Sequence, residues 1–279
     1  MTHDHGGTTP AHLLDLEGAV LAAYWTQALD DVRTAAPADP RRVLDLGAGS
    51  GVGTLGLARR FADAEIVALD ADEAGLEHLR HRADEAGVSD RVRTVVADLD
   101  DIDGDGWPDL GALDVTWASM SLHHLTDPGR VLRALHTATR PGGLLAVAEF
   151  EAPLRVLPDD IGLGRPGLES RLHDTFGAEH AHDLPHLHDD WAPQLTTAGF
   201  DLVAERRFSI DLRPPHEPDV ALYVRGMLER MRGGLGDRLD TQDRAALDEL
   251  LDGDGPHALR HRADLHLRGT RTVTLARRT

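Results

Sequence analysis

The chain has 279 residues, 41% of them hydrophobic and 28% charged, which is the composition of a soluble globular protein with a sizeable core. Acidic residues outnumber basic residues by 48 to 29, and the resulting formal charge of −19 repels nucleic acids and anionic membranes. The chain contains no Cys, Lys or Asn, which excludes disulfides, thiolate nucleophiles, Cys-ligated metals and Schiff-base lysines.

The first residues carry no targeting pattern, because residues 1–7 lack a basic region followed by an apolar one. No apolar stretch approaches the about 20 residues that a membrane-spanning helix needs. We therefore expect a cytoplasmic protein whose partners include neither a membrane nor a nucleic acid. After this segment, residues 11–35 are predicted to form one helix with an apolar stripe that includes Tyr24 and Trp25.

Residues 41–151 alternate short apolar strands with amphipathic helices. The predicted strands cover residues 42–46, 65–70, 92–98, 113–118 and 144–150. The predicted helices cover residues 52–62, 72–86 and 127–139. Five strands in this alternation imply a parallel sheet with helices on both faces, which is a doubly wound α/β fold.

The alternation ends after residue 151. The next segment is rich in Pro, Gly, His and Asp and extends to residue 188. The rest of the chain predicts a helix over 189–198, a strand over 201–210, a helical stretch over 216–252 interrupted at Gly233-Gly234, and a strand over 269–276. Because no clean linker separates these segments, we interpret the chain as one domain, 1–279, with insertions.

A glycine-rich turn, Gly47-Ala48-Gly49-Ser50-Gly51, follows the first predicted strand directly. Glycines at such a turn let the backbone approach a ligand closely, and the helix that follows aims its N–H groups at that ligand. The dinucleotide pattern Gly-x-Gly-x-x-Gly also occurs, at residues 51–56. It is misplaced, because the strand ends near Leu46 and the pattern should begin there. This match is weak evidence for a dinucleotide.

The stretch 43–51 (Val-Leu-Asp-Leu-Gly-Ala-Gly-Ser-Gly) closely resembles the first motif of the class I, Rossmann-like S-adenosylmethionine (SAM)-dependent methyltransferases. Four further places resemble the same family in the expected order: Leu69-Asp70, Asp98, the stretch 119–125 and the turn 140–145. The resemblance covers roughly residues 41–151, with weaker support at 189–210 and 270–279.

This resemblance implies a seven-stranded sheet that is mostly parallel with an antiparallel last strand. It places the core at about 37–151, 189–210 and 269–279. The remaining segments would be an N-terminal helical cap (1–36) and two insertions (152–188 and 211–268) that emerge at the ligand edge of the sheet. We expect these three segments to form the lid and the substrate pocket.

The resemblance also implies SAM as the cofactor. Asp70 would accept hydrogen bonds from the ribose hydroxyls, since an ionised carboxylate is an acceptor only, and Asp98 would accept from the adenine amino group. The predicted cofactor-binding residues are Asp45, Gly47, Ala48, Gly49, Ser50, Gly51, Asp70, Ala71, Asp98, Leu99, Ser119 and Tyr24.

Two adjacent histidines follow the fourth strand at the edge where the cofactor is expected. A histidine there could remove the proton of a hydroxyl or ammonium acceptor at neutral pH. We predict His123 as the base or orienting residue, with His124 as the second candidate. The predicted function is methyl transfer from SAM to an O or N atom, less readily C, of a small molecule. The sequence leaves a homodimer open.

Two alternatives remain. An NAD(P)-dependent oxidoreductase would place a sixth parallel strand where the resemblance implies an antiparallel one. A non-catalytic SAM- or metal-binding protein would use the cluster of His and Asp residues within 173–190, although its spacing matches no metal signature and no metal ligand is predicted. The members of this cluster are His173, Asp174, His180, His182, Asp183, His186, His188, Asp189 and Asp190.

Overall fold

The computed structural model describes residues 9–101, 107–182, 184–187, 189–214 and 216–279. The chain forms two compact units. Unit 1 comprises Met1–Leu21, Ala152–Asp183 and Ser209–Thr270, and unit 2 comprises Ala22–Glu151, Leu184–Phe208 and Arg271–Thr279. Every residue that the sequence predicts for the cofactor and for catalysis lies in unit 2.

A seven-stranded sheet has the order β3-β2-β1-β4-β5-β7-β6 and belongs to unit 2, except for residues 209–212 of β6 and 267–270 of β7, which belong to unit 1. The strands are β1 (Arg42–Leu46), β2 (Glu65–Asp70), β3 (Val92–Val96), β4 (Leu113–Ser119), β5 (Thr139–Phe150), β6 (Asp201–Leu212) and β7 (Leu267–Arg277). The pairs from β3 to β5 are parallel, whereas β5 and β7 are antiparallel. This order confirms the predicted fold class. It also contradicts the oxidoreductase alternative, which requires a parallel strand beside β5.

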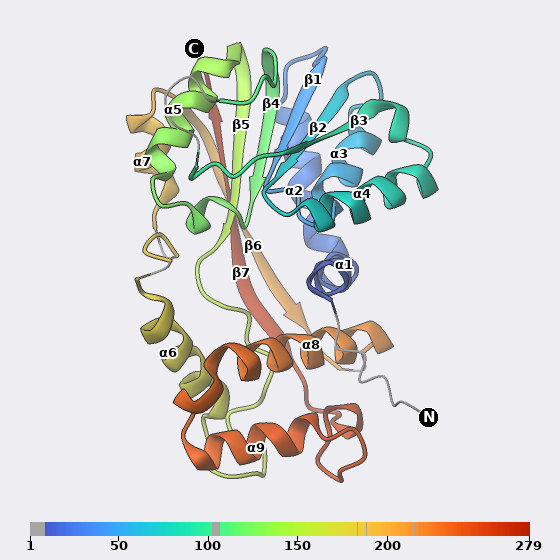
Figure 1. The fold of residues 1–279 in the computed structure, drawn as a ribbon, viewed down its shortest axis with the longest axis vertical. Coiled ribbons are helices and arrows are strands. Elements are labelled where there is room, and N and C mark those ends of the chain that lie inside the picture. Colours follow the sequence, from blue (N-terminus) through green and yellow to red (C-terminus); the bar gives the residue numbers. More distant parts are fainter. Residues whose placement is uncertain (1–8, 102–106, 183, 188, 215) are drawn as a thin grey trace. The chain divides into compact units, whose positions relative to one another are not determined.

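Helices cover both faces of this sheet: α2 (Ala22–Ala35), α3 (Val52–Arg60), α4 (Glu73–Glu85), α5 (Pro128–Ala138) and α7 (Trp191–Thr197). In Figure 1, α5 and α7 lie on one side of the strands, and α2, α3 and α4 lie on the other. Successive side chains of β2 point to opposite faces of the sheet, so this strand contributes to an apolar core on each face. Val67 and Leu69 pack with Leu132 and Phe200 on the α5–α7 face, whereas Ala68 packs with the α3–α4 face.

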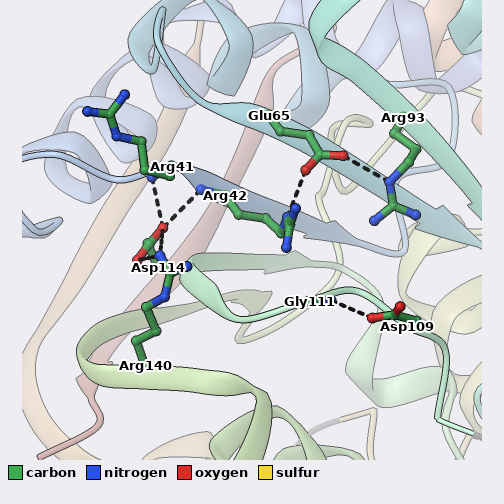
Figure 2. Close-up of polar contacts among 8 residues, drawn as sticks. All are labelled: Arg41, Arg42, Glu65, Arg93, Asp109, Gly111, Asp114 and Arg140. Carbon is green, nitrogen blue, oxygen red and sulfur yellow. Dashed lines mark hydrogen bonds and ion pairs between the residues drawn. The ribbon is translucent and has the colours of Figure 1, made fainter.

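The amino-terminal edge of the sheet is occupied by its own ion pairs (Figure 2). The backbone N–H groups of Arg41 and Arg42 and the guanidinium of Arg140 all donate to the carboxylate of Asp114, at 2.7–2.9 Å. Burial alone would raise the pKa of Asp114, but these hydrogen bonds outweigh it and lower that pKa. Glu65 likewise accepts from Arg42. These charged groups are paired with one another. A ligand site is expected at the opposite edge, where the carboxyl ends of the parallel strands lie.

Unit 1 is held together by helices and buried carboxylates. Its helices are α1 (Pro10–Val20), α6 (Leu168–His180), α8 (Pro218–Leu235) and α9 (Thr241–Leu251). Asp243, at the start of α9, accepts hydrogen bonds from Arg171 at 2.7 Å and from Arg165 at 3.0 Å. Glu169, on α6, accepts the N–H groups of Val156 and Leu157. Short 3-10 helices lie at Gly236–Arg238 and Leu259–His261 in unit 1, and at Ser89–Arg91 and Leu122–His124 in unit 2.

Three elements differ from the sequence predictions. The helix predicted over 11–35 breaks at Leu21, because α1 packs on α8 in unit 1 while α2 packs on α3 in unit 2. Gly233-Gly234 lies inside α8, and the break falls instead at Gly236, whose φ is +51°. The Pro- and Gly-rich segment after residue 151 contains α6, which buries Leu168 and Leu172.

Candidate functional site

The glycine-rich turn connects β1 to α3 and uses left-handed backbone at alternate residues. The φ angles of Gly47, Gly49 and Gly51 are +72°, +52° and +88°. A Cβ on Gly47 would lie 2.4 Å from the Cβ of Ser121, and one on Gly51 would lie 2.1 Å from Leu79. Only glycine fits both positions, because any side chain would clash and would strain the backbone.

Asp70 fastens this turn to the end of β2. Its carboxylate accepts the N–H of Gly49 at 2.8 Å and the N–H of Asp72 at 2.9 Å. The N–H groups of Gly47 and Ala48 donate to the carbonyl of Leu69, at 2.8 and 3.0 Å. A carboxylate offers about four lone-pair sites, so Asp70 can still accept from a ligand while it holds the turn.

Two predicted residues at this edge carry buried hydroxyls without a partner in the described part of the chain. These are the Oγ atoms of Ser50, in the glycine-rich turn, and of Ser119, at the end of β4. A buried hydroxyl without a hydrogen bond costs about 1–3 kcal/mol, so a polar ligand atom beside it is favourable. The turn, the Asp70 carboxylate and these hydroxyls therefore offer hydrogen-bonding groups to a polar ligand such as SAM.

The predicted residues after the ends of β2 and β3 lie at the protein surface or in the core. Asp98 is exposed, and its carboxylate accepts the N–H of Asp100 at 2.9 Å. Leu99 is buried in the core, and its carbonyl accepts from Arg130. Ala71 is exposed beside Asp70. The side chain of Asp98 is therefore open to a ligand, whereas that of Leu99 packs inward.

Asp45 and Tyr24 lie in the interior. Asp45 is 2% exposed and accepts a hydrogen bond of 2.6 Å from Thr54 on α3. Burial raises the pKa of Asp45 to about 7, although the Thr54 hydrogen bond opposes this and the Asp70 charge adds to it. The Tyr24 ring contacts the rings of Trp25 and Phe208, with centroids 5.7 and 5.5 Å apart. Their cofactor roles stay predictions.

His123 is paired with a carboxylate that the sequence analysis missed. Its Nδ1 lies 2.7 Å from Oε2 of Glu149, at the end of β5, and both side chains are buried. Oε1 of Glu149 accepts the N–H of Ser121 at 3.2 Å. His124 is exposed, and its ring centroid lies 4.1 Å from that of His123. The only signal for Glu149 was an acidic residue at the end of an otherwise apolar strand.

Met120 and Arg271 complete this edge from β4 and β7. Met120 has a φ of +55°, an uncommon conformation for a non-glycine residue that is often found at functional sites. The guanidinium of Arg271 lies 3.5 Å from the sulfur of Met120 and 5.4 Å from the ring centroid of Phe150. The left-handed Met120 turns the chain from β4 towards Ser121 and His123.

The His and Asp residues of 173–190 are dispersed over their segment. His186 pairs with Asp189 at 2.7 Å, and His180 contacts the carbonyl of Phe176. Asp183 and His188 lie outside the described residues. Within the described ranges, no group of three His, Asp or Glu side chains is arranged to hold a metal ion. An open hollow of about 420 Å³, lined from within residues 256–264, contains none of the predicted site residues.

Among the residues that the structure describes, no helix is long and apolar enough to cross a membrane.

Comparison with known proteins identifies the central part of the chain. A family model described as a methyltransferase domain matches residues 43–143. A malonyl-[acyl-carrier protein] O-methyltransferase of Halorhodospira halophila is 39% identical over 40% of this chain and 35% of that protein. The 27-O-demethylrifamycin SV methyltransferase of Amycolatopsis mediterranei is 36% identical over 39% of this chain and 38% of that protein. The chain thus spans little more than a third of these two relatives.

Solved structures share the fold at low identity. A Bacillus halodurans protein, provisionally assigned as a methyltransferase, is 16% identical with a TM-score of 0.57, over 92% of this chain and all of that one. Phosphoethanolamine N-methyltransferase 2 of Haemonchus contortus, solved with S-adenosylhomocysteine, is 16% identical with a TM-score of 0.53, over 99% of this chain and 58% of that one. The [4+2]-cyclase SpnF is 18% identical with a TM-score of 0.52, over 98% of this chain and 95% of that one.

The family match covers the glycine-rich turn, Asp70 and His123. Residues 43–143 therefore match the methyltransferase domain family, within a chain that shares the fold of solved structures named as methyltransferases.

Proposed function

We propose that this protein is a SAM-dependent methyltransferase that acts on an oxygen or nitrogen atom of a small molecule. The observation that carries the proposal is the hydrogen bond from the N–H of Gly49, in the glycine-rich turn, to the carboxylate of Asp70. Both residues lie within the segment that matches the methyltransferase domain. His123 follows β4, and Glu149 lies near the end of the neighbouring strand β5. The pair therefore lies at the same edge of the sheet. A ligand site and a base are thus expected on one edge of one unit.

The cofactor is held by the residues of that edge. Asp70 accepts the ribose hydroxyls with the lone pairs that Gly49 and Asp72 leave unused. Ser50 and Ser119 offer their hydroxyls to polar atoms of the ligand. The exposed carboxylate of Asp98 accepts from the adenine amino group. When bound, SAM supplies an electrophilic methyl group on a sulfonium.

His123 is the proposed proton acceptor. The 2.7 Å contact fits a ring hydrogen on Nδ1 donated to the carboxylate of Glu149, and a neutral ring in that tautomer has its lone pair on Nε2. Nε2 can therefore take the proton that a hydroxyl or ammonium acceptor loses as it becomes methylated. Both side chains are almost fully buried, so little water reaches the pair.

The acceptor is proposed to be a small molecule with a reactive oxygen. By their names, one of the two sequence relatives is an O-methyltransferase of malonyl-[acyl-carrier protein] and the other is a methyltransferase of 27-O-demethylrifamycin SV. The formal charge of −19 disfavours a nucleic acid. The proposed partner is therefore a small-molecule acceptor.

Calorimetric titration with S-adenosylhomocysteine, with NADH as the control ligand, tests the cofactor assignment. We expect saturable binding of S-adenosylhomocysteine at one site per chain and none of NADH. Binding of NADH alone, or of neither compound, would contradict the proposal.

A second candidate is a SAM-binding protein that does not transfer the methyl group. A cyclase with the same fold shows that the fold alone does not determine the reaction. Incubation with SAM labelled with ¹³C at its methyl group, and with a panel of small hydroxylated and carboxylated compounds, separates the candidates. Binding without any labelled product would favour the second candidate.

A further inference from the structure

Glu149 is a buried carboxylate that accepts two hydrogen bonds from the loop after β4. It is the last residue but one of β5 and is 6% exposed. Oε1 accepts the backbone N–H of Ser121 at 3.2 Å, and Oε2 lies 2.7 Å from Nδ1 of His123. Each carboxylate oxygen thus serves a different donor, two residues apart on one loop.

The same loop is tied to the glycine-rich turn. The hydroxyl of Ser121 donates to the carbonyl of Leu46 at 2.9 Å, at the end of β1. The Cβ of Ser121 occupies the space that a side chain on Gly47 would need. Glu149 therefore holds a loop that carries His123 on one side and supports the turn predicted to bind the cofactor on the other.

We propose that Glu149 is a positioning residue for the reaction: it keeps the His123 ring in the tautomer that carries its hydrogen on Nδ1, and it aims the free Nε2 at the methyl acceptor. This inference rests on the proposed function, because the acceptor defines the proton that Nε2 takes. The relationship between the carboxylate and the ring is independent of the cofactor.

Glu149→Gln tests the role with the smallest change in shape. Ser121 and His123 face different oxygens of Glu149, and glutamine replaces one of these oxygens with an NH₂ group, so it has no acceptor at one of the two positions. When its oxygen faces the Ser121 N–H, its NH₂ group faces Nδ1 of His123 and drives the ring hydrogen to Nε2. Glu151→Gln is the matched control, because Glu151 is exposed and contacts Arg207 and Thr272 instead.

The first readout is the tautomer, observed by ¹⁵N NMR of protein labelled in its 17 histidines, with His123→Gln to assign the signal. Wild-type protein should show a protonated Nδ1 and an unprotonated Nε2 at His123, and Glu149→Gln should reverse them. If Glu149→Gln fails to fold, the wild-type spectrum still decides, because a hydrogen on Nε2 there overturns the proposal.

The second readout is turnover. A misplaced general base costs about 10²–10⁴-fold in rate, so kcat of Glu149→Gln should fall by at least about 10²-fold. Affinity for S-adenosylhomocysteine should stay within about threefold of wild type, and Glu151→Gln should match wild type in both. A kcat of Glu149→Gln equal to that of Glu151→Gln overturns the positioning role and leaves the proposed function intact. Absence of S-adenosylhomocysteine binding in wild type removes the proposed function, while the tautomer still tests the Glu149–His123 relationship.

Discussion

The amide of Gly49 donates a hydrogen bond of 2.8 Å to the carboxylate of Asp70, and this bond joins the glycine-rich turn after β1 to the end of β2. Asp70 also accepts the N–H of Asp72, which begins the approach to α4. One carboxylate thus fixes the backbone of two loops at the edge where parallel sheets bind ligands. Its proposed ribose contacts add to this structural role.

Asp70→Ala should weaken binding of S-adenosylhomocysteine by roughly 10- to 100-fold, because hydrogen bonds to a charged group contribute about 1.5–3 kcal/mol. Calorimetric titration measures the change. Asp63→Ala is the control, since Asp63 is exposed in the turn before β2. Equal affinities of the two variants would remove the ribose assignment.

Gly47→Ala should destabilise unit 2 more than Gly87→Ala does. Both glycines have positive φ, +72° and +67°, so both substitutions strain the backbone. A Cβ at Gly47 would meet the Cβ of Ser121 at 2.4 Å, whereas one at Gly87 would meet nothing within 4 Å. Urea denaturation should show an additional loss of about 1–3 kcal/mol for Gly47→Ala. Equal losses would mean that the clash relaxes freely.

Asp45→Asn should make the free energy of unfolding less dependent on pH. Burial raises the pKa of Asp45 from 3.8 to about 7, so the folded protein binds a proton that the unfolded chain releases between these values. Wild-type stability therefore falls as pH rises from about 4 to 7, by up to about 4 kcal/mol at 1.36 kcal/mol per pH unit. Asparagine carries no charge and can still accept from Thr54.

The test is urea denaturation of both proteins at pH 5 and pH 8. The stability of Asp45→Asn relative to wild type should increase between these values. A difference that does not change with pH would show that Asp45 titrates near its ordinary pKa.

Asp243→Ala should destabilise unit 1 by about 1–3 kcal/mol, because it removes a buried acceptor shared by Arg165 and Arg171. The hydrogen bonds from Arg171 lower the pKa of Asp243, and burial opposes them only in part. Its contribution is therefore present above the unfolded pKa and is lost as pH falls through the folded value. Asp254→Ala, at an exposed pair with Arg260, should change the stability little.

Denaturation followed at pH 7 and at pH 3 checks this contribution. The difference between Asp243→Ala and wild type should shrink at the lower pH, and a constant difference would contradict the assignment.

Periodic patterns predicted the elements of the sheet because its core positions are almost purely apolar. The strand over 65–70 and the end of the strand at Phe150 have the predicted limits. Local patterns failed where distant packing decides. The division at Leu21 separates residues that pack in different units, and α6 forms between clusters of Pro and Gly that masked it.

In the candidate site, too, local sequence patterns predicted the residues of a motif but not those that distant packing brings together. The glycine-rich turn and Asp70 were predictable because a motif specifies their conformation and their order. Glu149 was not, because its partner His123 lies 26 residues earlier and meets it only through the pairing of β4 with β5. Arg271 was missed for the same reason, since it reaches Met120 from a strand 151 residues away.

A crystal structure of the protein with S-adenosylhomocysteine tests the central claim most directly. The account predicts the ligand at the carboxyl edge of the sheet, with both ribose hydroxyls within hydrogen-bond distance of Asp70 and the backbone of Gly47–Gly51 against it. A ligand bound elsewhere on unit 2, or on unit 1 alone, would contradict it.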